Sequence, residues 1–190
     1  MQTTEQKTTT VKQVSSLGQI TIRPFRLEDL DIVMTIEPHA FGPNHWSRQV
    51  FINELNGTAG IYFVAVESLS TQVLGYSGFW LIGQEAHITT LAVHPDHQRQ
   101  YIGERLLINN ILQSRAMGAR WLTLEVRASN EAAQKLYSKY GFKSLGVRPR
   151  YYQDNLESAL VFWSENIETQ QFKQLLDERT TALQKYEAQI

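Results

Sequence analysis

The stretch "HPDHQRQYIGERLL", residues 94–107, decides the fold because it joins a strand-like segment to a helix-like one. Residues 86–93 before it predict a strand, and the apolar pattern of residues 103–117 predicts a helix. A turn that opens a helix directs unpaired backbone N–H groups outward and bears about half a positive charge. With Arg99 in it and Gly103 open to close approach, the turn is a candidate anion site. A plain strand-to-helix connection explains these residues equally well.

The segments on either side of this turn predict one α/β (α+β) domain with a mixed, largely antiparallel sheet and helices on both faces. About six or seven strands are expected, and the last two should pair across a loop of about ten residues rich in Arg and Tyr. Expected strands cover residues 20–25, 61–66, 73–82, 86–93, 121–127, 142–147 and 159–163. Expected helices cover residues 27–37, a short segment from Ser47, 103–117, 131–140 and 165–189. Polar residues 1–18 predict a loose tail.

Composition and charge exclude several classes of function. The chain has 190 residues, 42% of them hydrophobic, which is enough for one core. A net charge of -1 gives no broad basic field, so no direct nucleic-acid partner is expected. The absence of cysteine excludes disulfides, thiolate nucleophiles and Cys-based zinc sites. Without a long apolar run or a signal-peptide core, the sequence predicts a soluble cytoplasmic protein with no membrane partner.

A carboxylate stands in a strand that should be central to the sheet. In "WLTLEVRASN", residues 121–130, Glu125 lies on the face opposite Leu124 and Val126. A carboxylate at such a place is costly unless it is paired or used. Glu125 is therefore a candidate catalytic group, with an ion pair to Arg127 or another base as the alternative.

The helix that follows presents a tyrosine to the sheet. Asn130 is a good N-cap, and Ala133, Leu136, Tyr137 and Tyr140 share one helical face. The Tyr137 ring should therefore point inward, either to take part in chemistry or only to pack and donate a hydrogen bond.

Three segments together carry a resemblance to a known family. They are "LAVHPDHQRQYIGERLL" (91–107), "LTLEVRASNEAAQKLYSKYGF" (122–142) and "RPRYYQDNLESA" (148–159). They resemble the GNAT acetyltransferase superfamily and, within it, the RimI-like ribosomal-protein-alanine N-acetyltransferases. The patterning covers residues 20–163, which implies a GNAT domain at 19–164 and a helical extension at 165–190.

The resemblance implies an acetyl-CoA site and two catalytic residues. Glu125 would be the proton acceptor and Tyr137 the proton donor, with no metal required. The family's pyrophosphate loop follows the pattern Gln/Arg-x-x-Gly-x-Gly/Ala, and the first glycine of that pattern is Tyr101 here. The residues expected to line the acetyl-CoA site are Leu91, Ala92, Val93, Arg99, Gln100, Tyr101, Ile102, Gly103, Glu104 and Asn130.

The acceptor side of the site should lie under the loop "HAFGPNHW", residues 39–46. Phe41, Trp46, Tyr151 and Tyr152 are the candidate walls for a peptide, although aromatic residues at such places also serve as ordinary packing. The implied activity is acetyl transfer to the α-amine of a protein N-terminus, with the N-terminal alanine of a small-subunit ribosomal protein as one candidate. The alternatives are an acetyltransferase for lysine side chains or small amines, and a non-catalytic acetyl-CoA-binding module.

Overall fold

The computed structural model describes residues 20–68, 70 and 72–187, so the tail predicted at residues 1–18 lies outside it. Seven strands form one sheet in the order β1-β2-β3-β4-β5-β7-β6. Every neighbouring pair is antiparallel except β4 and β5, which run parallel. The strands are β1 Ile20–Pro24, β2 Gly60–Glu67, β3 Val73–Ile82, β4 Glu85–Val93, β5 Trp121–Arg127, β6 Lys143–Tyr152 and β7 Glu157–Trp163. This confirms the predicted mixed, largely antiparallel sheet.

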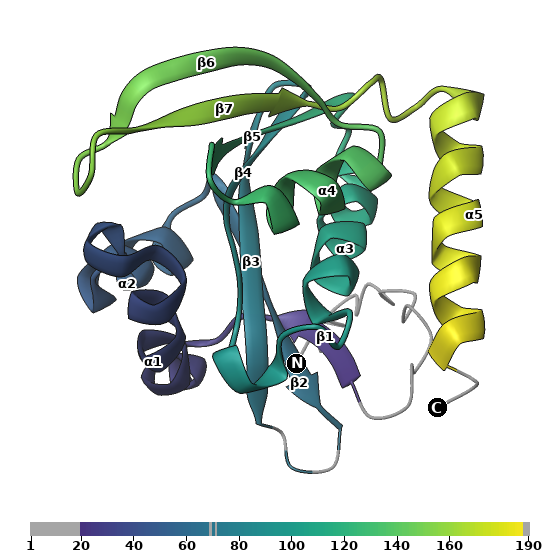
Figure 1. The fold of residues 1–190 in the computed structure, drawn as a ribbon. Coiled ribbons are helices and arrows are strands. Elements are labelled where there is room, and N and C mark those ends of the chain that lie inside the picture. The colour runs from purple at the N-terminus through teal and green to yellow at the C-terminus, as the bar shows by residue number, and fades with distance from the viewer. Residues whose placement is uncertain (1–19, 69, 71, 188–190) are drawn as a thin grey trace, which may run out of the picture.

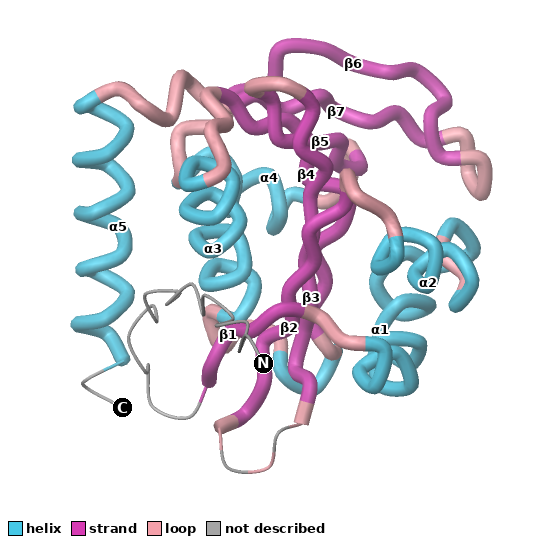
Figure 2. The backbone as a smooth tube through the Cα atoms, turned by 180° about the vertical axis from the view of Figure 1, so that it is seen from behind, coloured by secondary structure: helices cyan, strands magenta, loops and turns pink. Residues whose placement is uncertain are grey.

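Helices cover both faces of the sheet, as Figures 1 and 2 show. Helices α1 (Leu30–Phe41) and α2 (Arg48–Asn56) lie on one face. On the other face lie α3 (Ile102–Ala116) and α4 (Glu131–Lys139), and α5 (Gln170–Glu187) runs outside α3. Among the described helices, none combines the length and the apolar character that crossing a membrane requires.

The terminal helix α5 is part of the main core. Its side chains Phe172, Leu176 and Leu183 are 3%, 2% and 4% exposed and belong to the same apolar cluster as Ile108 and Ile111 of α3. Burying three large apolar side chains contributes several kcal/mol, at about 1.5–3 kcal/mol each. The sequence left open whether this helix packs on the domain, and the structure shows that it does.

Several segments differ from the predicted boundaries, and helix α5, predicted from residue 165, begins at Gln170. Helix α1 continues to Phe41, so the loop expected at residues 39–46 starts with helix. The helix continues through Pro38, whose missing N–H removes one backbone hydrogen bond. It ends at Gly42, whose φ of 57° lies outside the helical region. Strand β6 continues to Tyr152, and its ladder closes with a pair between Tyr152 and Glu157, so the loop before β7 is much shorter than expected.

The parallel strands β4 and β5 diverge soon after they pair. Only Glu85–His87 of β4 pairs with Trp121–Thr123 of β5. On its other side, the pairing of β4 with β3 changes register. Gly78 pairs with Thr90, whereas the next residue, Phe79, pairs with Ile88, two residues earlier on β4. Such a bulge bends a strand. Beyond His87 the two strands leave a gap that opens towards their carboxyl ends, and this gap positions the candidate site.

Candidate active site

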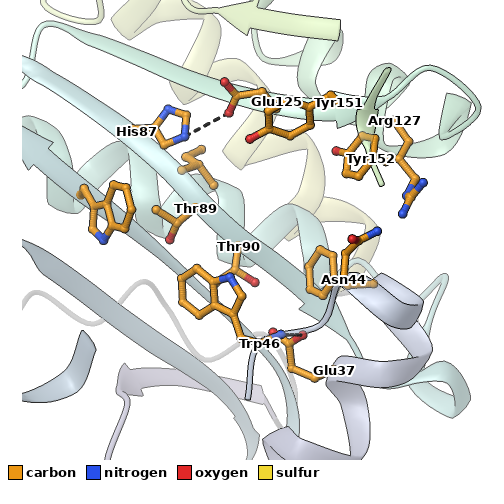
Figure 3. A pocket seen from close by; sticks show the side chains of 13 residues that line it. Glu37, Asn44, Trp46, His87, Thr89, Thr90, Glu125, Arg127, Tyr151 and Tyr152 are labelled. Carbon is orange, nitrogen blue, oxygen red and sulfur yellow. Dashed lines mark hydrogen bonds and ion pairs between the residues drawn. The ribbon is translucent and has the colours of Figure 1, made fainter. Parts of the chain in front are cut away.

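A cavity of about 450 Å³ lies between α1 and the strands β4, β5 and β6 (Figure 3), a size typical of ligand sites. All four aromatic residues expected on the acceptor side line it, and so does Glu125. The lining residues are Glu37, Phe41, Asn44, Trp46, Trp80, His87, Ile88, Thr89, Thr90, Glu125, Arg127, Tyr151 and Tyr152. The cavity therefore joins aromatic walls to two carboxylates, Glu37 and Glu125.

Glu125 is held by two basic groups from two other strands, β4 and β6. Its Oε2 lies 3.1 Å from His87 Nε2 and its Oε1 2.9 Å from an Arg148 guanidinium nitrogen, and its side chain is 10% exposed. The hydrogen bond with His87 and the charge of Arg148 lower the pKa of Glu125, although burial opposes this. Figure 3 shows the His87 contact at one end of the cavity. Glu125 is therefore ionised at neutral pH and lines the cavity.

The predicted alternative, an ion pair of Glu125 with Arg127 or another base, is wrong for Arg127, whereas other bases, His87 and Arg148, do contact Glu125. Arg127 instead contacts Asp154 at 3.0 Å and Glu157 at 3.2 Å, and its guanidinium lies 3.9 Å from the centre of the Tyr152 ring. These contacts hold the loop between β6 and β7 against the cavity. The contacts of Arg127 therefore stabilise one wall of the cavity.

Tyr137 faces the gap between the diverged strands. It lines a small cavity together with Glu125 and Leu91, so both candidate catalytic residues border one space. The Tyr137 ring is 7% exposed and packs near Phe142 and Phe162, with ring centres 6.0 and 6.1 Å away. Burial raises the pKa of the Tyr137 hydroxyl, which therefore keeps its proton at neutral pH.

A further cavity of about 510 Å³ follows the turn at the start of α3. Nine of the ten residues expected at the acetyl-CoA site line it: Leu91, Ala92, Val93, Arg99, Tyr101, Ile102, Gly103, Glu104 and Asn130. Gln100 does not line it, because its side chain is exposed and its Nε2 reaches the Asp96 carbonyl at 3.4 Å. Asn130 also caps α4 by accepting a hydrogen bond from the Ala133 N–H at 3.0 Å.

Glu104 takes part in a contact between α3 and α4. Its carboxylate accepts a hydrogen bond from the Tyr140 hydroxyl at 2.6 Å and pairs with Lys139. The side chain is 7% exposed, so this contact is largely shielded from water. The Glu104 carboxylate thus fixes the first turn of α3 while the backbone of the turn stays open to the cavity.

Two residues that the sequence analysis missed support the acceptor wall. Glu37, 1% exposed, accepts hydrogen bonds from the Tyr76 hydroxyl at 2.5 Å and from the Trp46 N–H at 3.1 Å. Burial raises the pKa of Glu37. Asn44 donates to Asp154 at 2.8 Å and thereby links the loop after α1 to the loop after β6. The two loops that flank the cavity are therefore joined across it.

Comparisons with known proteins place the chain in a family. The model of the acetyltransferase (GNAT) family matches residues 29–142. A putative [ribosomal protein bS18]-alanine N-acetyltransferase of Bacillus subtilis is 37% identical over 142 residues, which cover 75% of this chain and 93% of that protein.

Solved structures agree with this. The crystal structure of the ribosomal-protein-S18-alanine N-acetyltransferase from Escherichia coli matches with a TM-score of 0.69 and 31% identity, covering 76% of this chain and 92% of that one. A GNAT acetyltransferase from Elizabethkingia anophelis with acetyl-CoA bound shares the fold at a TM-score of 0.64 and 22% identity, over 78% of this chain and 99% of that one. The chain therefore belongs to the GNAT acetyltransferase family, as an acetyl-CoA-dependent N-acetyltransferase of the RimI-like group.

Proposed function

We propose that this enzyme acetylates the α-amine of a protein N-terminus and that the N-terminal alanine of a ribosomal protein such as bS18 is its substrate. The similarity to the putative bS18-alanine N-acetyltransferase of B. subtilis and to the S18-alanine N-acetyltransferase of E. coli supports this substrate. A cytoplasmic location belongs to the same proposal, because ribosomal proteins are made there. The observation that carries the proposal is the placement of Glu125 and Tyr137 on one gap that opens into both larger cavities.

The chemistry favours an α-amine over a lysine side chain. An α-amine with a pKa of about 7.7–8.0 is already partly neutral at pH 7, whereas a lysine with a pKa of about 10.4 is almost fully charged. Glu125 is a weak base, because His87 and Arg148 hold its pKa down. Such a carboxylate suits an amine that is already partly neutral at pH 7 and therefore does not need a strong base to deprotonate its ammonium form.

The reaction is a group transfer in which the amine nitrogen bonds to the thioester carbonyl carbon. Glu125, directly or through a water, accepts the proton that the nitrogen loses as the tetrahedral intermediate forms. The carbon–sulfur bond then breaks, and Tyr137 donates its proton to the departing thiolate. Return of the proton from Glu125 to the tyrosinate, through solvent, restores the enzyme. The products are the acetylated N-terminus and CoA.

The residues present fit acetyl-CoA as the co-substrate. Because β4 pairs with β5 only as far as His87, the edge of Leu91–Val93 that faces the gap is free of strand pairing to β5 and is available to the pantetheine amides. The turn before α3 offers backbone N–H groups to the pyrophosphate. At Gly103 an added Cβ would make only ordinary van der Waals contacts, 3.5 Å from the Val93 side chain and 3.6 Å from that of Leu91, so packing within the protein does not itself require a glycine there.

The dependence of rate on pH distinguishes an α-amine from a lysine. For a peptide that begins with Ala and contains Lys, we expect kcat/KM to rise tenfold per pH unit below about pH 7.7–8.0 and to level off above it. The pKa of Glu125 is lowered, so the loss of rate that protonation of Glu125 causes occurs at acid pH, far from this range. The measurement is steady-state CoA release between pH 6 and pH 10. A kcat/KM that climbs steadily through pH 9 would assign the reaction to the lysine side chain.

A further inference from the structure

The turn that opens α3 holds two residues in the left-handed backbone region. Arg99 has φ 62° and Tyr101 has φ 60° and ψ 8°. A residue with a Cβ adopts this region at a cost that glycine avoids. Tyr101 stands where the family's loop pattern has its first glycine. The backbone thus keeps a conformation that suits glycine, so another contact must stabilise it in the presence of the Tyr101 side chain.

The Tyr101 ring has a partner on α5. Its centre lies 4.7 Å from that of Tyr186, and the two planes are tilted by 58°. Hydrogen bonding with Tyr186 raises the pKa of the Tyr101 hydroxyl. Tyr186 is 46% exposed, whereas Leu183, one turn earlier, is 4% exposed in the core. The anchored part of α5 therefore carries the Tyr186 ring to the turn.

The same turn borders the cavity proposed for acetyl-CoA. Tyr101 and Gly103 line that cavity, and the Tyr101 carbonyl accepts the first helical hydrogen bond of α3, from the Arg105 N–H at 3.0 Å. Moving Tyr101 would therefore move the backbone groups that start α3. Helix α5, Gln170–Glu187, lies beyond residues 29–142, which the family model matches.

We propose that α5 is a positioning element of the acetyl-CoA site, in which Tyr186 packs on Tyr101 and holds the pyrophosphate turn in its binding conformation. The inference rests on the proposed acetyl-CoA site and deepens it. Tyr186 acts through Tyr101 and does not touch the reacting atoms, so it should affect affinity for CoA and leave the chemical step unchanged.

Calorimetric titration of the full chain with CoA tests this. An aromatic pair is worth about 0.5–1.5 kcal/mol, so Tyr186→Ala is expected to raise the Kd about 2- to 12-fold with kcat unchanged. Tyr186→Phe should retain most of the affinity, because the ring remains. Lys185→Ala, an exposed neighbour on the same helix, is the control for general disturbance of α5. Thermal melting checks that each variant is folded.

The second half of the test is a double-mutant cycle. Tyr101→Gly restores the residue that suits the left-handed turn and removes the ring, so Tyr186→Ala should have no further effect in that background. An unchanged Kd for Tyr186→Ala alone would overturn the inference, and so would an equal loss in both backgrounds. If the unaltered protein did not bind CoA at all, the acetyl-CoA site itself would be misplaced, which is a separate failure.

Discussion

Replacing Glu125 with Gln is expected to lower turnover by about 10²- to 10⁴-fold while the Kd for acetyl-CoA stays nearly constant. The amide keeps the size of the carboxylate and loses its ability to accept a proton from the amine. Its environment indicates such a role, because the side chain lines both the acceptor cavity and the gap that Tyr137 borders. Pre-steady-state measurement of CoA release, together with a binding titration, separates the two effects.

Glu85→Gln is the matched control for this change. Glu85 lies on β4 and accepts a hydrogen bond from Thr123 at 3.0 Å, in the same chain of contacts that reaches Glu125 through His87. It lines none of the three cavities of the site. Glu85→Gln should therefore keep most of the turnover. An equal loss in the two variants would mean that Glu125 supports the local hydrogen bonds and is not the proton acceptor.

Replacing Tyr137 with Phe is expected to lower turnover by about 10²-fold or more, because the variant has no hydroxyl to protonate the thiolate. The ring packing against Phe142 and Phe162 would be kept, so stability should change little. The loss should shrink for an acyl donor whose leaving group needs no proton, such as an acetyl thioester of an acidic aromatic thiol. Parallel assays with the two donors measure this dependence.

Tyr140→Phe serves as the control for the loss of a buried tyrosine hydroxyl in this region. The Tyr140 hydroxyl bonds to Glu104, so its removal is expected to cost about 1–3 kcal/mol of stability with turnover largely retained. If Tyr137→Phe and Tyr140→Phe behaved alike with both donors, Tyr137 would be a packing residue only.

The parts of the site that depend on local periodicity could be predicted from the sequence. Period-two alternation places Glu125 opposite Leu124 and Val126, and the helical period turns Tyr137 towards the sheet. The position of the turn before Gly103 follows from the change from the strand period to the helical period. Each of these features is fixed by residues close together along the chain, and the structure finds them near the cavities.

The parts that depend on distant pairing could not be predicted. Arg127 shares a strand face with Glu125, which suggested an ion pair, but Asp154 and Glu157 attract it to the loop after β6. The actual partners, His87 and Arg148, come from other strands, so finding them requires the register of the sheet. His87 alternates with apolar residues on β4, and that pattern alone does not distinguish a partner of a carboxylate from an exposed histidine.

Contacts of the loops and of α5 are even harder to predict from the sequence. The bond between Asn44 and Asp154 joins segments that are 110 residues apart, and the contact between Tyr101 and Tyr186 depends on how α5 docks. Extension of β6 to Tyr152 likewise depends on the pair between Tyr152 and Glu157 of β7, which forms beyond an irregular stretch that carries Pro149. Local propensity is a weak guide where tertiary pairing decides the outcome.

The proposed reaction places the acetyl group on the α-amine of a protein N-terminus. The most direct test is incubation with acetyl-CoA and a peptide that has both an N-terminal Ala and an internal Lys, followed by mass-spectrometric location of the acetyl group. A copy blocked at the α-amine is run beside it. We expect acetylation of the free α-amine alone and no product from the blocked copy. Acetyl-lysine in the blocked peptide, or CoA binding without transfer to either peptide, would contradict it.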